Sequence, residues 1–506
     1  MSTSTRGEIA IGAIWMLAFK LTERSLGFLS TLVLVRVLTP NDFGVMAMAM
    51  SLIAVLELLK SFSFDVALIQ RREVTRDHLD TAWTFNLIFG LLVALLIVAL
   101  ARPASVYYSE SGLEAVAYAL AVGWMVSSFE NIGVVAFRRD LRFGDEYRFL
   151  VAKKVATVAV TVPLAIWLRS YWALVVGVVL GKVLSVAISY ALHNHRPRLS
   201  LAAARDLMGF SGWLFINNVL YFFNERVTDF VLGRIAGTRA LGTYNVSFEI
   251  ANLPTTEIVA PINRAMLPGY SKIAREGSDL ARTYMDTVGV MALFSLPAGL
   301  GIAALARPLV DLLLGAQWHD AVPLIQILGV YGAIASLGTN TASALMAVGR
   351  QRALTALAAL RLVLLVPAVI WGCQAAGMVG VAWAVLGVTA AVTPVNFGAL
   401  LPVLGLRVSA FVNAIWRPAA AAALMYLAVT TALAALHAAH LDHVLLQLLV
   451  GMAVGAIVFL AAIGALWRLS GKPESAESLV ARRLAGMLAA RRARAVVASA
   501  GTADRT

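Results

Sequence analysis

Apolar runs of about 20 residues, separated by short polar segments, follow one another along almost the whole chain. A run of this length crosses the hydrocarbon core of a bilayer as an α-helix. The pattern predicts an all-α polytopic membrane protein with about 14 transmembrane helices. The predicted spans are 12–37, 44–68, 80–101, 113–137, 147–168, 171–192, 208–235, 240–263, 284–306, 321–347, 353–374, 377–403, 413–436 and 444–467.

The two halves of the sequence repeat each other. The matched pairs, each 198 residues apart, are Trp15 and Trp213, Arg36 and Arg234, and Gly44 and Gly242. Further along the offset is 204, where Pro163-Leu-Ala-Ile-Trp167 recurs as Pro367-Ala-Val-Ile-Trp371. A repeat of whole helical bundles is typical of secondary transporters, whose substrate site lies where the repeats meet.

Each repeat contains an even number of predicted spans, so both repeats enter the membrane in the same direction. We therefore expect two parallel-oriented six-helix repeats beside a central cleft, followed by two additional helices. The predicted domains are an N-terminal lobe at 1–199, a C-terminal lobe at 200–405, two further transmembrane helices at 406–470 and a basic cytoplasmic tail at 471–506. Within the tail, 478–498 has the pattern of a basic amphipathic helix lying on an anionic membrane surface; a disordered tail is the alternative.

Composition and charge support this class. With 60% hydrophobic and only 14% charged residues, the chain is not a soluble enzyme, because soluble domains carry about a quarter charged residues. The net charge of +13 does not indicate a nucleic-acid partner, since the basic residues gather in alternate loops. This positive-inside bias places both termini in the cytoplasm.

Several ionisable residues fall inside the predicted spans, where each costs about 2.5–3.5 kcal/mol unless it faces a partner or a watery cavity. Lys20, Glu23 and Arg24 share one face of the first span, and the matching stretch of span 208–235 is also polar. One interpretation is that such charges only neutralise one another and hold helices together. The recurrence of polar faces at matching positions of both halves favours a cleft. Polar and acidic candidates for that cleft, or for a coupling proton or sodium ion, are Glu57, Asp65, Asn218, Glu225, Asp229 and Glu249.

Other intramembrane charges have no evident partner in the sequence. We expect Glu130, Lys182, Arg226 and Arg361 to be lone charges. Lys153 and Lys154 lie nearer a cytoplasmic end, where long side chains extend to the interface.

Three segments resemble a known family. Arg36-Val-Leu-Thr-Pro-Asn-Asp-Phe-Gly44 is similar to the R-x-L-x-P-x-[DE]-[FY]-G junction of Wzx-type polysaccharide flippases, in the multidrug/oligosaccharidyl-lipid/polysaccharide exporter superfamily. Phe137-Arg-Arg-Asp-Leu-Arg-Phe143 and Asn263-Arg-Ala-Met-Leu-Pro-Gly-Tyr-Ser-Lys-Ile273 resemble that family's loops after spans 4 and 8. The resemblance covers about residues 8–470 and favours the colanic-acid and teichuronic-acid exporter branch. For Pro40 and Gly44 we expect structural roles as turn residues.

The resemblance implies a function. A protein of this family carries undecaprenyl-pyrophosphate-linked oligosaccharides across the bacterial inner membrane by alternating access, for exopolysaccharide biosynthesis. Its partners would be the lipid-linked substrate, the bilayer, and a polysaccharide polymerase and glycosyltransferases. The family's cationic, substrate-binding cavity maps here onto Lys20, Arg24, Lys182 and Arg226, and cationic groups, Arg above all, suit a phosphate-bearing head group.

Other functions fit the sequence less well. His437, His440 and His443 are more typical of a solvated loop than of a metal site, and no phosphate-binding P-loop motif occurs. We therefore expect no metal, no cofactor beyond a coupling cation, and no enzymatic activity. A cation-coupled multidrug antiporter with the same fold is one alternative, although its cleft would favour acidic residues. A membrane polysaccharide polymerase or ligase is another, although it would need a sizeable external loop.

Overall fold

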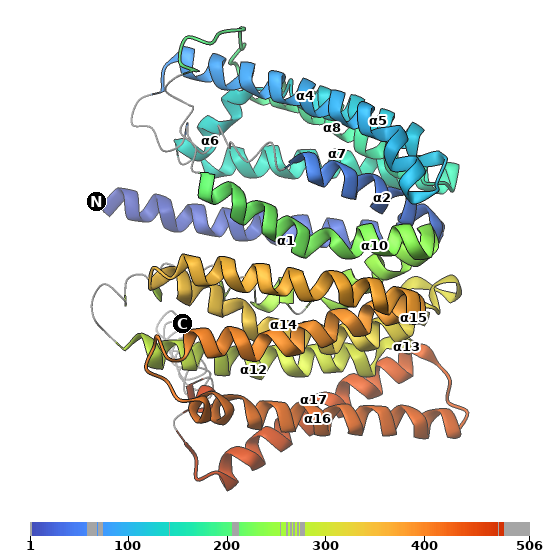
Figure 1. The fold of residues 1–506 in the computed structure, drawn as a ribbon, viewed down its shortest axis with the longest axis vertical. Helices are drawn as coiled ribbons and strands as arrows, with labels where there is room; N and C mark the ends of the chain where they lie inside the picture. The colour runs from blue at the N-terminus through green and yellow to red at the C-terminus, as the bar shows by residue number, and fades with distance from the viewer. Residues whose placement is uncertain are drawn as a thin grey trace, which may run out of the picture. The chain divides into compact units, whose positions relative to one another are not determined.

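A computed structural model of the chain describes residues 3–57, 68, 74–140, 142–204, 212–253, 255–259, 262–263, 266, 269–270, 273, 279–473 and 475–479. These residues form helices joined by short loops, with no strand among them (Figure 1). The helices are α1 (Thr3–Val37), α2 (Pro40–Glu57), α4 (Arg76–Tyr108), α5 (Gly112–Ser127), α6 (Val135–Arg139), α7 (Phe143–Leu168), α8 (Trp172–Leu192), α10 (Gly212–Ala251), α12 (Leu280–Ala304), α13 (Ala306–Leu309), α14 (Ala321–Ala347), α15 (Gln351–Leu400), α16 (Val408–Ala438) and α17 (Val444–Leu469), with short 3₁₀ or π segments η2 (Ile132–Val134), η3 (Thr255–Val259), η4 (Val310–Leu314) and η5 (Ala316–Trp318). The predicted all-α class is confirmed.

The helices agree with the apolar pattern. Among the described residues, eight helices are long and apolar enough to cross a membrane, or nine if α5 and the segment Ile132–Arg139, bent by 65°, form one span. Helix α10 is interrupted at Gly237, with φ +82°, and α15 at Gly377, with φ +57°, a conformation that glycine adopts without strain. Gly237 falls between the predicted spans 208–235 and 240–263, and Gly377 is the first residue of the predicted span 377–403. The total of 14 crossings stays a prediction.

The chain packs as two compact units. The first comprises Met1–Asn245, Leu313–Trp318 and Val369–Met378, and the second Val246–Leu312, His319–Ala368 and Val379–Thr506. In the first unit α7 packs against α1 and α8, and α5 against α4 and α8 (Figure 1). In the second, α12 packs against α14 and α16, and α16 against α17. The predicted lobes at 1–199 and 200–405 stay a prediction.

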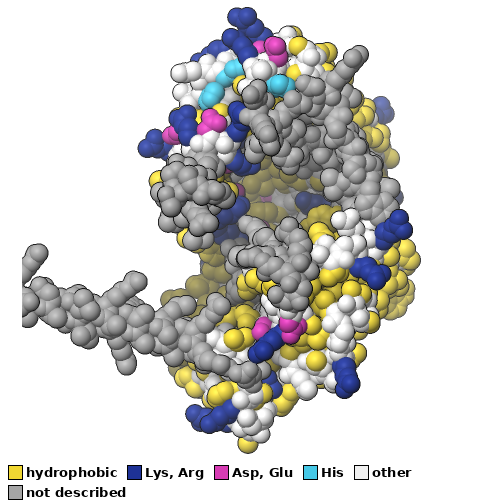
Figure 2. Space-filling view, turned by 90° about the vertical axis from the view of Figure 1, so that its left-hand side faces the viewer, with side chains coloured by type: hydrophobic (Ala, Val, Ile, Leu, Met, Phe, Trp, Pro, Cys, Tyr) yellow, Lys and Arg dark blue, Asp and Glu magenta, His cyan; other side chains and the backbone are white. Residues whose placement is uncertain are grey.

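Basic loops of the first unit meet at one of its ends. Arg76, at the start of α4, donates a hydrogen bond to the carbonyl oxygen of Arg196, after α8, at 3.3 Å. Asn131, between α5 and α6, donates to the carbonyl oxygens of His193 and His195, at 3.1 and 2.8 Å. Figure 2 looks onto this end and shows Lys and Arg side chains gathered there. Within this unit, the loops that the sequence identified as basic therefore lie together at one end.

At the opposite end of the first unit, the start of α2 packs against the segment of α10 that follows Gly237. A Cβ atom on Gly44 would overlap the carbonyl oxygen of Thr238, and one on Gly242 would overlap the carbonyl oxygen of Pro40. The contact is reciprocal, because Thr238 and Gly242 lie 198 residues after Pro40 and Gly44. Gly44 is therefore not a turn residue as expected: it lies within α2, and its missing side chain permits this close backbone approach.

Two arginines extend the same reciprocal contact. Arg36, at the end of α1, donates from Nε to the carbonyl oxygen of Leu313 at 3.1 Å. Its equivalent Arg234 donates from Nη1 to the hydroxyl of Ser109 at 3.4 Å. Ser109 and Leu313 are 204 residues apart, which is the second offset of the repeat. Each arginine thus contacts the segment that follows the third predicted span of the other sequence repeat.

We expect Gly44→Ala and Gly242→Ala each to destabilise the protein by about 1–3 kcal/mol, because the added methyl group must push two backbones apart. The measurement is the midpoint of thermal unfolding of the purified protein in detergent. Gly464→Ala is the matched control, since a Cβ there meets nothing within 4 Å. Equal midpoints for all three variants would contradict the proposed tight contact.

Candidate functional site

The predicted cations of α1 lie on a surface of the first unit. Lys20 is exposed, and its Nζ forms an ion pair with Glu23 at 3.0 Å. Arg24 is half-buried one turn further along. Beyond it Gly27 contacts α7, where the ammonium group of Lys154 lies beside the glycine. The polar stripe predicted for α1 therefore lies beside Lys154, whose side chain the sequence predicted to extend to the membrane interface.

On α10, Arg226 is not the lone charge that the sequence suggested. Its Nη1 pairs with Asp229 at 3.2 Å, and the side chains are 43% and 8% exposed. Asn245, on the later segment of the same helix, also hydrogen-bonds the Asp229 carboxylate. Glu225 and Glu249 are exposed. Asp229 thus pairs with Arg226, the one substrate-binding cation predicted on this helix. The sequence offered a signal for this pair, because residues three positions apart lie on the same face of a helix.

Lys182 lies near the middle of α8 with its Nζ 3.5 Å from the ring centroid of Trp124 on α5. This stacking was not predicted, because two residues 58 positions apart carry no local signal. Cation–π contacts retain a Lys at low dielectric without neutralising its charge.

Two predictions in the same region were wrong: that Glu130 is a lone charge and that Lys153 extends to the interface. The two residues instead form an ion pair, with Lys153 Nζ 3.0 and 2.9 Å from the two carboxylate oxygens of Glu130. The hydroxyl of Ser185, on α8, donates to the same carboxylate at 2.9 Å. Helices α7 and α8 and the break after α5 thus share one polar cluster.

The first unit contains all four predicted cations, but on separate helices. Lys20 and Arg24 lie on α1, Lys182 on α8 and Arg226 on α10. Of the acidic and polar candidates, Asp65 and the side chains of Glu57 and Asn218 lie outside the described residues.

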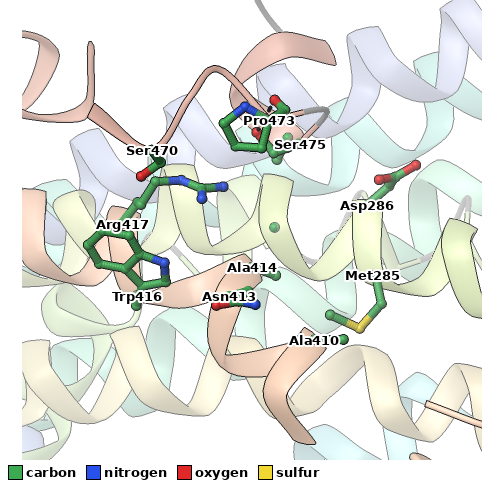
Figure 3. A pocket seen from close by; sticks show the side chains of 12 residues that line it. Met285, Asp286, Ala410, Asn413, Ala414, Trp416, Arg417, Ser470, Pro473 and Ser475 are labelled. Atoms are coloured by element: carbon green, nitrogen blue, oxygen red, sulfur yellow. Dashed lines mark hydrogen bonds between the residues drawn. The ribbon is translucent and has the colours of Figure 1, made fainter. Parts of the chain in front are cut away.

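A pocket of about 470 Å³ occurs in the second unit, between α12, α16 and the segment after α17 (Figure 3). Arg417 lines it from α16, opposite Ser475, while Asp286 lines it from α12. Arg417 is already neutralised, because its Nε lies 2.9 Å from Glu477 and the two side chains are only 6% and 9% exposed. The pair fastens the segment 475–479 to this unit, so the pocket is a structural feature of the tail's attachment.

Elsewhere, possible metal ligands do not assemble. His437 pairs with Asp442 at 2.7 Å in an exposed loop. Within the described part of the chain, no three His, Cys, Asp or Glu side chains are grouped to hold a metal ion.

Known proteins resemble this chain in sequence and in fold. The family model described as polysaccharide biosynthesis protein matches residues 33–323. The lipopolysaccharide biosynthesis protein WzxC of Escherichia coli (strain K12) is 25% identical over 424 residues, which are 82% of this chain and 85% of WzxC. The succinoglycan biosynthesis transport protein ExoT of Rhizobium meliloti (strain 1021) is 24% identical over 506 residues, covering 96% and 97% of the two chains.

Among solved structures, the lipid II flippase MurJ in an inward closed conformation superposes with a TM-score of 0.70. The match covers 89% of this chain and 99% of MurJ at 11% identity. Likeness at that identity shows the fold, which is that of a multi-pass membrane transporter.

The attachment of 475–479 should depend on pH. Burial by itself raises the pKa of Glu477, but hydrogen bonds from Arg417 and Ser475 outweigh it and hold the pKa below its usual value. Such a group stabilises the folded state above the pKa of a free glutamate, about 4.3, and this contribution is lost as the pH falls through the lower folded value. We expect amide hydrogen exchange of 475–479, corrected for intrinsic rates, to accelerate over that range.

Glu477→Gln should give fast exchange in this segment already at neutral pH. Asp442→Asn, in an exposed loop, is the control and should leave it unchanged. Protection of 475–479 that is the same at every pH would contradict the assignment.

Proposed function

Because the chain belongs to the polysaccharide biosynthesis protein family, we propose that it carries undecaprenyl-pyrophosphate-linked oligosaccharide repeat units across the bacterial inner membrane for exopolysaccharide biosynthesis. The family match over 33–323 is the observation that carries the proposal. The name of ExoT as a succinoglycan biosynthesis transport protein and the fold shared with a lipid II flippase support it. The protein is a transporter and not an enzyme.

The proposed mechanism is alternating access between the lobes 1–199 and 200–405. The pyrophosphate and sugar would pass through the cleft while the polyprenyl chain stays in the lipid. Support comes from the sequence duplication and from the reciprocal contact of Gly44 and Gly242, which joins equivalent helix ends of the two halves.

Within the cleft, Lys20, Arg24, Lys182 and Arg226 are the proposed contacts for the pyrophosphate. Lys20 and Arg226 have a carboxylate within 3.2 Å, so each cation is neutralised before substrate arrives. If a phosphate oxygen took the place of Glu23 or Asp229 during substrate binding, the positive charge of Lys20 or Arg226 would have an anionic partner at every stage. The proposed coupling ion, a proton or sodium, would be held by acidic or polar side chains from the set Glu57, Asp65, Asn218, Glu225, Asp229 and Glu249.

The orientation in the membrane follows from the loop charges. Both termini are proposed to be cytoplasmic, because the basic loops belong on that side. Glycosyltransferases would then deliver the substrate from the cytoplasm, and a polymerase would receive it on the periplasmic side.

Deletion of the gene should make lipid-linked repeat units accumulate on the cytoplasmic side of the membrane and abolish the polymer at the cell surface. The measurement is extraction of polyprenyl-linked glycans, together with their accessibility to a glycosidase in right-side-out vesicles. A multidrug antiporter would instead change drug resistance without such accumulation. A polymerase would leave single repeat units on the periplasmic side.

A charge series at Arg226 tests the cationic cleft. Asp229→Asn keeps the cation, so export should fall less in this variant than in Arg226→Gln combined with Asp229→Asn, which should reduce it roughly tenfold or more. The double variant leaves no orphaned buried charge, so it should insert and fold. Normal polymer yield from a folded double variant would count against a role of Arg226 in binding.

A further inference from the structure

The chain turns sharply directly after α17, where the C-terminal tail begins. Gly471 and Lys472 have φ of +79° and +54°, and the backbone N–H of Lys472 donates to the carbonyl oxygen of Trp467 at 3.0 Å. The indole N–H of Trp467 donates to the carbonyl oxygen of Pro473 at 3.2 Å and closes the turn. The turn leads the segment 475–479 back to α12 and α16, with which it lines one pocket (Figure 3).

The start of the tail is fixed on these two helices. Ser475 begins a helical turn, because its carbonyl oxygen accepts a hydrogen bond from the N–H four residues later at 3.0 Å. Ala476 is buried against Gly289 of α12, where an added Cβ atom would lie 2.9 Å from the Cβ of Ala476. Glu477 forms the buried ion pair with Arg417 of α16. Packing and charge thus hold the same turn from two sides.

The place of this attachment along α12 and α16 indicates its depth in the membrane. Gly289 lies five residues beyond the start of the predicted span 284–306, and Arg417 lies four residues beyond the start of the predicted span 413–436. At a rise of about 1.5 Å per residue, the tail starts about 6–8 Å inside the predicted cytoplasmic ends of both spans. Amphipathic helices that lie on a bilayer bury their apolar face about 5–10 Å into the same boundary. The attachment therefore sets the tail at the depth of an interfacial helix.

The turn itself presents two cations beside an apolar side chain. Leu469 is 84% exposed, and the neighbouring Arg468 and Lys472 are exposed as well. No ion pair joins either cation to an acidic side chain within the described part of the chain. This arrangement suits the headgroup boundary of a bilayer, where lipid covers the leucine and phosphate groups meet the charges.

Residues 480–506 lie outside the described residues, but their sequence continues the same chemistry. The apolar residues that share one helical face are Val480, Leu484, Met487 and Leu488. The arginines of the same stretch are Arg482, Arg483, Arg491, Arg492 and Arg494. No acidic residue occurs in the sequence between Glu477 and Asp504. A polybasic segment with an apolar face is complementary to a surface of anionic phospholipids.

We propose that the tail segment 480–494, together with Arg468 and Lys472, is an interaction surface for anionic phospholipids of the cytoplasmic leaflet, anchored by the Arg417–Glu477 pair. The anchor holds the start of the segment at interfacial depth before any lipid is bound. Tethering of this kind raises the effective concentration of the arginines at the headgroups and lowers the entropy cost of binding. The choice of leaflet rests on the proposed orientation, whereas the lipid chemistry is independent of the cargo and goes beyond the proposed function.

The test is amide hydrogen exchange of 480–494, corrected for intrinsic rates, in the full-length protein in nanodiscs of phosphatidylglycerol and of phosphatidylcholine. The segment should exchange at least roughly tenfold more slowly in the anionic lipid. Each arginine near an anionic surface raises partitioning about fivefold, so Arg482→Gln with Arg483→Gln should remove most of that difference. Arg407→Gln, an exposed cation at the N-cap of α16, is the matched control and should leave the difference unchanged.

Two results would overturn the lipid surface. Exchange at the intrinsic rate in both lipids would mean a disordered tail. Equal protection in both lipids would mean that the tail binds the protein itself, for which Asp279 and Asp286 offer carboxylates in the pocket that Leu479 also lines.

The anchor has a test of its own. Arg417→Gln with Glu477→Gln removes the ion pair without leaving an orphaned buried charge, so this double variant should fold. Its segment 480–494 should lose about fivefold or more of the protection that phosphatidylglycerol gives to the wild type, because the tail is no longer tethered at the interface. Full protection in the folded double variant would overturn the anchor.

Discussion

The backbone contact between the start of α2 and the later segment of α10 is the constraint on which the packing of this end of the first unit depends. Gly44 and Gly242 bring equivalent helix ends close enough that each glycine touches a carbonyl oxygen of the other half. Arg36 and Arg234 bind across the same region. A joint made of backbone is rigid in its spacing, because no side chain can rearrange to widen or narrow it.

Charge pairing at low dielectric is the second recurring feature. Lys20, Lys153 and Arg226 each have a carboxylate at about 3 Å. Taking an isolated charge out of water is costly, and a partner offsets much of that cost without removing the charge. Such pairs lower the cost of keeping a cation inside the membrane.

The break after α5 combines both features. Asn131 and Ser128 satisfy or pack the polar groups that an interrupted helix exposes, so the irregular backbone is stable where it is surrounded by protein. The charged residue at the break, Glu130, pairs with Lys153 and accepts a hydrogen bond from Ser185. In the second unit, by contrast, the buried Arg417–Glu477 pair fastens the segment 475–479 to α16, and the two charges of the pair neutralise each other.

The apolar runs determined the class of fold, and the repeat offsets determined which residues are equivalent, because both are periodic properties of the chain. Helix ends agreed closely at Val37, Leu168 and Ala347, where a polar residue or a glycine follows within two positions. The sequence also located the intramembrane charges, since hydropathy makes each one stand out. Partners were decided by the tertiary structure: Glu130 and Lys153 are 23 residues apart, and Lys182 and Trp124 are 58 apart. Such pairs depend on which helix faces lie together, and helix packing is set by side-chain shape over several elements at once rather than by any local pattern.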